Sequence, residues 1–221
     1  MQKENIMSKT FASANYTAGQ LNAIVKLLQQ QGNGQDAPDR YLRGELVVSE
    51  PVRRWEERDG VIYLTVTSDG TTGSEWITRL EKNDFHISNY VKQLLCSSDF
   101  QPTSGVICQI AILKGMIFSD KDRVTKKIRA YTSERNFSKP NAEVACLIRE
   151  NFSDEEIKAM GLIWIITMHE PIKDSDGDLY LLNANRNGGG RWLRAYYDTP
   201  GRGWGRGHGF AFVVSQVSSE S

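Results

Sequence analysis

Apolar residues recur at helical spacing near the start of the chain and at strand spacing further along it. An apolar stripe with helical spacing runs from Leu21 to Leu28, and Thr17 to Gln20 before it has the pattern of a capping box. Apolar and polar residues then alternate from Val61 to Thr67, which predicts a half-buried strand. The first hundred residues are therefore expected to combine helices with strands.

Three apolar segments predict the main strands of the second half. Val106 to Leu113 is an apolar run that contains one polar residue, Gln109, and its length and β-branched content favour a buried strand over the alternative of a buried helix. Leu162 to Met168 is the most apolar of the predicted strands, and Phe210 to Val214 predicts a buried final strand. Helices are predicted over 120–135, from Lys139-Pro140-Asn141 onward and after Ser153. The expected order is strand, two helices with a short third, strand, long loops and strand.

We predict three parts along the chain. Residues 1–40 would form a flexible tail and an amphipathic helix, residues 41–100 a small α+β accessory unit, and residues 101–217 a ligand-binding domain. The accessory unit would hold a short strand from Glu45 to Ser49, the alternating strand, and two short helices near Trp76 and Tyr90. The fold class expected from this order is α+β.

Composition narrows the function classes. The chain has 221 residues, with 27 Lys and Arg against 27 Asp and Glu, so no global field attracts nucleic acid or an anionic membrane. Cys96, Cys108 and Cys146 are far apart in apolar surroundings, which favours reduced thiols over a disulfide or zinc framework. No apolar run reaches the ~18 residues needed to span a bilayer, and the start lacks an apolar signal core. We therefore expect a cytoplasmic protein without membrane insertion.

The most unusual stretch runs from Leu179 to Val214. Glycine and proline interrupt both the helical and the strand period, while large Arg, Tyr and Trp side chains recur between them. From Asn183 to His208 there are five Arg, no Lys and one acid, Asp198. This pattern predicts a Gly-rich loop face that binds a ligand. The displayed residues would be Asn183, Asn185, Arg186, Asn187, Arg191, Arg194, Tyr196, Tyr197, Asp198, Arg202, Arg206 and His208, and the framework Trp192, Leu193, Pro200, Trp204, Gly209 and Phe210.

Several short motifs resemble one branch of the C-type lectin fold. Gly189-Gly190-Arg191-Trp192 resembles the G-G-S-W turn of the formylglycine-generating-enzyme branch, with Arg in place of Ser. The segment from Arg194 to Ala211 is similar to the R-x-A-Y…P…R…G-F-R ending of that branch, with Trp204 and Ala211 in place of arginines. Pro140 to Val144 resembles its L-P-T-E-A-E-W helix start. The resemblance covers Val106 to Gln216 and implies a C-type-lectin-like mixed domain with a small N-terminal α+β unit.

The ending also resembles the variable proteins of diversity-generating retroelements. In those proteins adenine-directed mutagenesis varies exposed residues while framework residues and the last strand stay constant. The resemblance implies a non-catalytic protein that recognises a protein or surface ligand. The enzyme branch needs a redox-active cysteine pair in its C-terminal region, and this chain has no cysteine after Cys146, so that activity is not carried over.

Two further motifs leave alternatives open. Asp174, Asp176 and Asp178 could surround Ca²⁺ with oxygen ligands, although the twelfth loop position of an EF-hand would be Asn185 rather than Glu. The alternative is a solvated acidic turn in which Gly177 supplies a positive φ. His169-Glu170 could be a base with its orienting acid in a metal-dependent enzyme, or a satisfied pair at a strand end.

The segment from Gly201 to Phe210 has a competing interpretation. Arginines and aromatic residues in a glycine-rich ribbon can bind single-stranded RNA through phosphate contacts and base stacking. The neutral overall charge and the apolar strand that follows favour an ordered loop instead.

Overall fold

The computed structural model describes residues 17–31, 34–46, 53–187 and 190–218. The chain divides into two compact units, Met1–Arg53 and Arg54–Ser221. All five tryptophans of the sequence lie in the second unit. Among the described helices, none has the length and apolar character needed to cross a bilayer.

The first unit contains helices α2 (Ala18–Gln31) and α3 (Ala37–Leu42). The predicted capping box at the start of α2 is confirmed: the Thr17 Oγ1 accepts from the Gln20 backbone N–H at 3.3 Å, and the Gln20 Oε1 accepts from the Thr17 backbone N–H at 2.8 Å. Among the described residues of this unit, Leu28 and Ala37 are the buried apolar ones. The predicted strand from Glu45 to Ser49 falls mainly outside the described residues, and Glu45 itself is not in a strand.

The second unit is built on a nine-stranded sheet with the order β1-β2-β4-β9-β5-β7-β8-β3, and β6 pairs with β7 outside this path. Most neighbours are antiparallel, whereas β5 runs parallel to β9 and β3 parallel to β8. The final strand β9 lies along the whole of β4, with Ile112 opposite Ala211. The strands are β1 (Trp55–Arg58), β2 (Val61–Asp69), β3 (His86–Ile87), β4 (Ser104–Lys114), β5 (Trp164–Thr167), β6 (Ile172–Lys173), β7 (Leu179–Asn187), β8 (Gly190–Tyr197) and β9 (His208–Ser218).

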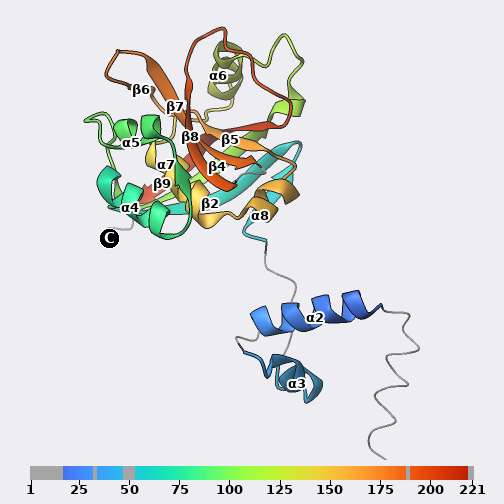
Figure 1. Ribbon diagram of the computed structural model, residues 1–221. Coiled ribbons are helices and arrows are strands. Elements are labelled where there is room, and N and C mark those ends of the chain that lie inside the picture. Colours follow the sequence, from blue (N-terminus) through green and yellow to red (C-terminus); the bar gives the residue numbers. More distant parts are fainter. Residues whose placement is uncertain (1–16, 32–33, 47–52, 188–189, 219–221) are drawn as a thin grey trace, which may run out of the picture. The chain divides into compact units, whose positions relative to one another are not determined.

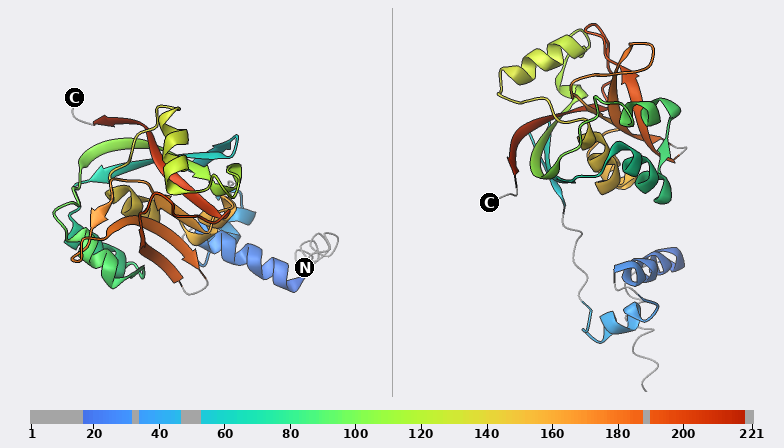
Figure 2. Two further views of the ribbon diagram at one scale, coloured as in Figure 1. Left: turned by 90° about the horizontal axis from the view of Figure 1, so that it is seen from above. Right: turned by 90° about the vertical axis from the view of Figure 1, so that its left-hand side faces the viewer.

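Both faces of this sheet are covered (Figure 1). The larger core lies between one face and helices α4 (Gly73–Lys82), α5 (Asn89–Leu95), α7 (Glu143–Asn151) and α8 (Asp154–Ala159). The smaller core lies on the other face, under α6 (Thr125–Ser133), the short 3-10 helix η1 (Gly115–Ile117) and the loop over 198–207. In the right-hand view of Figure 2, α6 in yellow-green lies on one side of the strands, and α4 and α5 in green lie on the other.

The main predicted elements of the second half are confirmed. The Val106 to Leu113 run is strand β4, which pairs with the predicted final strand. Ser153 caps α8 by accepting from the Glu156 backbone N–H, and Gly161 after it has a φ of 76°. The α+β class is therefore confirmed as a mixed sheet with, in the described chain, seven α-helices.

Two predictions about organisation are wrong. Residues 41–100 are not a separate accessory unit, because β2 pairs with β4 in one sheet and the contact boundary lies at Arg53. The stretch from Leu179 to Tyr197 is not a loop but the hairpin β7–β8. Its polar residues fit strands because the backbone hydrogen bonds of the ladder do not depend on side-chain polarity.

Candidate functional site

Strand alternation divides the predicted binding face into two surfaces. Successive side chains of a strand point to opposite sides of the sheet. On β8, Trp192, Arg194 and Tyr196 therefore face the side covered by α6, whereas Leu193 and Tyr197 face the helical side. The side that faces α6 gathers most of the arginine and aromatic side chains and is the candidate site.

A cluster of stacked rings forms the centre of this site. The Trp164 ring of β5 stacks on Tyr196 with centroids 4.8 Å apart and on His208 with centroids 4.3 Å apart. Trp204 meets the Tyr196 and His208 rings edge-on, at 6.4 and 6.1 Å. Burial first, and then the positive charges of Arg123 and Arg202, lower the pKa of His208 to about 4. His208 is therefore neutral at pH 7, and its Nδ1 accepts from the Gly205 N–H at 3.1 Å.

Arginines extend the ring cluster outward. The Arg202 guanidinium lies 5.1 Å from the ring centroids of both Tyr196 and Trp204. The Arg194 guanidinium lies 4.5 Å from the centroid of Trp192, whose ring also stacks on His86 of β3. Such cation–π contacts hold a guanidinium in place and leave its N–H donors free for a ligand. We call this surface the arginine–aromatic face, comprising His86, Trp164, Trp192, Arg194, Tyr196, Arg202 and His208.

Buried hydrogen bonds fix the loop that carries Arg202. The Trp204 Nε1 donates to Thr125 Oγ1 at 3.0 Å, and its backbone N–H donates to the Arg123 carbonyl. The buried Arg123 guanidinium in turn donates to the carbonyls of Gly115 and Phe118. The loop is therefore attached to η1, to α6 and to the segment between them, and its arginines project from a rigid support.

Two asparagines expected on the surface lie beneath this face instead. Asn183 and Asn185 of β7 are both 0% exposed, because β7 lies inside the sheet with β5 on one side and β8 on the other. Asn185 stands between Trp164 and Trp192, and Asn183 stands opposite Arg194. Neither the oxygen nor the nitrogen of either side-chain amide has a hydrogen-bond partner in the described chain. The prediction that they are displayed is wrong, and their unpaired amides need an explanation.

The other predicted residues divide by burial. Asp198 is also buried, contrary to expectation, because its carboxylate pairs with Arg129 of α6 at 2.8 Å. Trp204, Gly209 and Phe210 are buried as expected of framework residues, while Trp192 is half-buried and Pro200 exposed. Arg186 and Arg191 are half-buried and donate to the carbonyls of Leu162 and Asn83, and Arg206 is exposed. The Asn187 side chain lies outside the described part of the chain.

Sequence reasoning missed the residues contributed by distant strands. His86 reaches the site because β3 pairs with β8, and Trp164 because β5 pairs with β9 and β7. Trp164 carried only a weak signal, as the aromatic residue within the apolar run from Leu162 to Met168.

No family model, no curated protein and no solved structure matches the chain.

The acidic turn holds itself together through its own backbone. Asp174 Oδ1 accepts from the backbone N–H groups of Asp176 and Asp178, both at 2.9 Å, and Gly177 has the predicted positive φ of 86°. In the described part of the chain, no group of three or more His, Cys, Asp or Glu side chains is placed to hold a metal ion. Calcium binding by Asp174, Asp176 and Asp178 stays a sequence-based prediction.

His169 is used by the fold. It is 1% exposed, its Nε2 accepts from the Leu182 N–H at 2.9 Å, and its Nδ1 lies 2.6 Å from the Glu170 carbonyl. These contacts fix the tautomer with the proton on Nδ1. Burial lowers the pKa of His169 to about 4. Glu170 pairs with Lys139 rather than with the imidazole, so the two residues do not form a base with its orienting acid.

The segment from Gly201 to Phe210, for which RNA binding is the competing interpretation, has arginines but no aromatic ring available for base stacking. Trp204 and Phe210 are 6% and 0% exposed, and His208 is stacked on Trp164. Base stacking needs a ring with a free face. The order of this loop therefore favours the ligand-binding interpretation over RNA binding.

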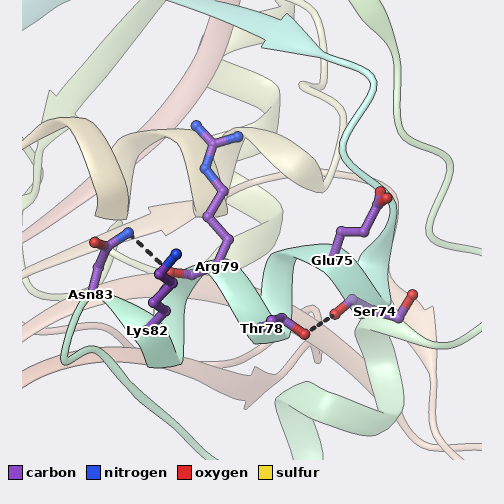
Figure 3. A pocket seen from close by; sticks show the side chains of 6 residues that line it. All are labelled: Ser74, Glu75, Thr78, Arg79, Lys82 and Asn83. Atoms are coloured by element: carbon purple, nitrogen blue, oxygen red, sulfur yellow. Dashed lines mark hydrogen bonds between the residues drawn. The ribbon is translucent and has the colours of Figure 1, made fainter.

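A hollow of about 510 Å³ along α4 is a less suitable site (Figure 3). Its lining side chains come from one helix and its end, and several bond to that helix: Thr78 donates to the Ser74 carbonyl, and Asn83 donates to the Arg79 carbonyl. Arg79 extends away from the others and pairs with Asp69 and Glu150. The hollow has no converging free polar groups.

Proposed function

We propose that this protein is a non-catalytic ligand-binding protein that recognises a protein or other surface ligand through its arginine–aromatic face. The observation that carries the proposal is the pair of buried, unpaired amides of Asn183 and Asn185 beneath that face. Leaving a buried polar group unpaired costs about 1–3 kcal/mol. Such groups persist where a ligand or an ordered water supplies the missing partner.

The surroundings of the two amides suit a ligand that enters from above. Arg194 and Trp192, which flank them on β8, are half-buried. In the described chain no hydrogen bond or ion pair holds the Arg194 side chain, and the Trp192 Nε1 is unpaired. A small shift of these two side chains would open the amides to a ligand. Arginine and tryptophan are also the residue types that contribute most to binding at protein interfaces.

We further propose that residues 101–217 adopt a C-type-lectin-like fold. The order β4, α6, α7, β5, hairpin, loop and β9, with β9 returning beside β4, supports this assignment. The hairpin replaces part of the expected loop, so the display positions are β8 and the loop over 198–207. This arrangement lets surface side chains change without altering the sheet.

Diversification by a retroelement is part of the same proposal. It requires a reverse-transcriptase gene near the coding sequence and a near-copy of its 3′ segment that differs at adenines. The structure sharpens the expected pattern: Arg194, Arg202 and Arg206 should vary among sibling proteins, while Trp204, Gly209 and Phe210 stay constant. If the neighbouring DNA holds no such copy, diversification is excluded and ligand binding alone is left to test.

Removing two arginines of the face should abolish most ligand binding. Ligands are first identified with an array of proteins and glycans. We expect the double variant Arg194→Ala/Arg202→Ala to bind them at least about tenfold more weakly than the wild type, since each substitution removes one charged contact with the ligand. Arg58 and Arg135 make the matched control, because they stack on Tyr63 and Tyr131, which are not among the residues of the face. Arg58→Ala/Arg135→Ala should retain wild-type binding. Equal binding by both double variants would contradict the proposal.

Replacing a buried asparagine by leucine should have opposite effects on stability and binding. Asn183→Leu is expected to raise the free energy of unfolding by about 1 kcal/mol, because an unpaired amide gives way to an apolar group of similar size. The same change should weaken ligand binding. Urea unfolding followed by tryptophan fluorescence measures the first effect and the array measures the second.

Asn141 provides the control for this substitution. Its side-chain amide donates to the Gln101 carbonyl and accepts from the Glu143 N–H. Asn141→Leu should therefore lower the free energy of unfolding by about 1–2 kcal/mol and leave binding unchanged. If Asn183→Leu destabilises the protein as much as Asn141→Leu, its amide is already satisfied and the central observation fails.

A further inference from the structure

The opposite side of the β7–β8 hairpin carries a second cluster of aromatic and charged residues. Tyr180 of β7 lies between two other tyrosines, with ring centroids 5.7 Å from Tyr90 of α5 and 4.6 Å from Tyr197 of β8. Tyr180 is buried, but Tyr90 and Tyr197 are 53% and 44% exposed. Three elements thus present a row of rings whose two outer members are exposed, on the side away from the arginine–aromatic face.

An acidic turn borders this row of rings. The Tyr197 hydroxyl donates to Asp178 Oδ2 at 3.3 Å, and Asp174 lies within electrostatic range of the Tyr180 hydroxyl. No ion pair joins Asp174, Asp176 or Asp178 to a lysine or arginine of the described chain. Lys173, the residue before the turn, is the basic side chain closest in sequence. Three carboxylates against one adjacent lysine therefore give this edge of the hairpin a net negative charge.

We propose that this tyrosine–acid surface, formed by Tyr90, Tyr180, Tyr197, Asp174 and Asp178, binds a basic segment of a partner protein that presents an arginine side chain. A guanidinium packs favourably over the face of a tyrosine ring, and its N–H donors match a carboxylate. The surface is open and spans α5, β7 and β8, which suits an extended segment. Phenol rings beside unpaired carboxylates are complementary in charge to arginine and repel an acidic ligand.

This surface is independent of the proposed function. Tyr197 and Arg194 project to opposite sides of β8, so one face can be occupied while the other is free. The inference also gives the acidic turn a function that needs no metal ion. The Asp178 carboxylate, which already accepts the hydrogen bond of the Tyr197 hydroxyl, would bind the arginine of the partner.

The test uses the full chain and a labelled peptide of alternating arginine and glycine, with fluorescence anisotropy as the readout. We expect the wild type to bind this peptide, to bind it more weakly at high salt, and not to bind a glutamate–glycine peptide of equal length. Tyr90→Ala and Asp178→Asn should each weaken binding about tenfold. Tyr41→Ala is the matched control, because Tyr41 is 46% exposed in the first unit, and it should leave binding within about twofold of the wild type.

The outcomes separate this inference from its alternatives. It is overturned if the wild type does not bind the arginine peptide, or if Tyr41→Ala weakens binding as much as Tyr90→Ala. Displacement of the peptide by calcium, but not by magnesium, would assign the turn to a metal ion instead. The Arg194→Ala/Arg202→Ala variant should bind the peptide as the wild type does, so failure here leaves the arginine–aromatic face untouched.

Discussion

Gly115→Ala is expected to lower the free energy of unfolding by about 3 kcal/mol and to abolish ligand binding. A methyl group on Gly115 would lie 2.7 Å from the Gly205 carbonyl oxygen and 2.9 Å from the His208 carbonyl oxygen. Both atoms belong to the backbone, so no side-chain rotation can relieve the overlap. The loop over 198–207 would have to move away from η1, and Arg202 and the ring of His208 would move with it.

Gly203→Ala is the matched control for this substitution. Gly203 belongs to the same loop, yet a Cβ built on it meets no heavy atom within 4 Å. Its free energy of unfolding should stay within about 0.5 kcal/mol of the wild type. Urea unfolding followed by tryptophan fluorescence reports on the second unit alone, because all five tryptophans lie there. Equal stability of the Gly115→Ala and Gly203→Ala variants would show that the loop is not packed against η1.

Features of the fold that depend on short stretches of sequence could be predicted from the sequence alone. The capping box at Thr17, the helix start at Ser153 and the positive φ of Gly177 depend on neighbouring residues only, and all three predictions are confirmed. The strand from Val106 to Leu113 was recognisable because a central strand whose faces are covered over most of its length is mainly apolar, with Gln109 as its polar residue.

The hairpin β7–β8 could not be recognised in the same way. Its two strands carry Asn183, Asn185, Arg194 and Gly190, which are poor strand signals. What makes them strands is pairing with β5 and β3, and that pairing depends on residues far away in the sequence. Treating the stretch as a loop placed all its large side chains on one surface. Alternation in a strand separates Tyr197 from Tyr196, and so turns one predicted site into two.

The burial of the asparagines has the same origin. A loop exposes polar side chains, whereas a central strand buries them on whichever side they fall. Asn183 and Asn185 lie on the same side of β7 as Leu181, which is part of the smaller core. Apolar residues at these two positions would therefore also be buried on that side. Keeping amides at these positions lowers stability, and a binding function is the explanation that we propose to test.

Acidification should destabilise the second unit by about 3 kcal/mol through His169 alone, between pH 6.5 and about 4. The pKa of His169 is lowered from 6.5 to about 4 because burial disfavours the imidazolium form. Above pH 6.5 the imidazole is neutral in both the folded and the unfolded chain, so it contributes no slope. As the pH falls below 6.5 the unfolded chain takes up a proton that the folded protein does not, and stability decreases until the folded pKa is reached. His208 contributes in the same direction, whereas the buried Glu143, whose pKa burial raises, acts in the opposite one.

His169→Gln isolates the contribution of this histidine, because glutamine does not titrate and its side-chain oxygen can still accept from the Leu182 N–H. At pH values above about 7 the variant should be less stable than the wild type, since its fit to the two backbone groups is poorer. On acidification to about pH 4 its free energy of unfolding should fall by about 3 kcal/mol less than that of the wild type. Glu143 and His208 are unchanged in the variant, so their effects cancel in the difference between the two profiles. Parallel profiles for wild type and variant would mean that His169 takes up its proton at the same pH in the folded and the unfolded chain. The buried imidazolium formed in that case could not accept the Leu182 hydrogen bond that holds β7 beside this strand end.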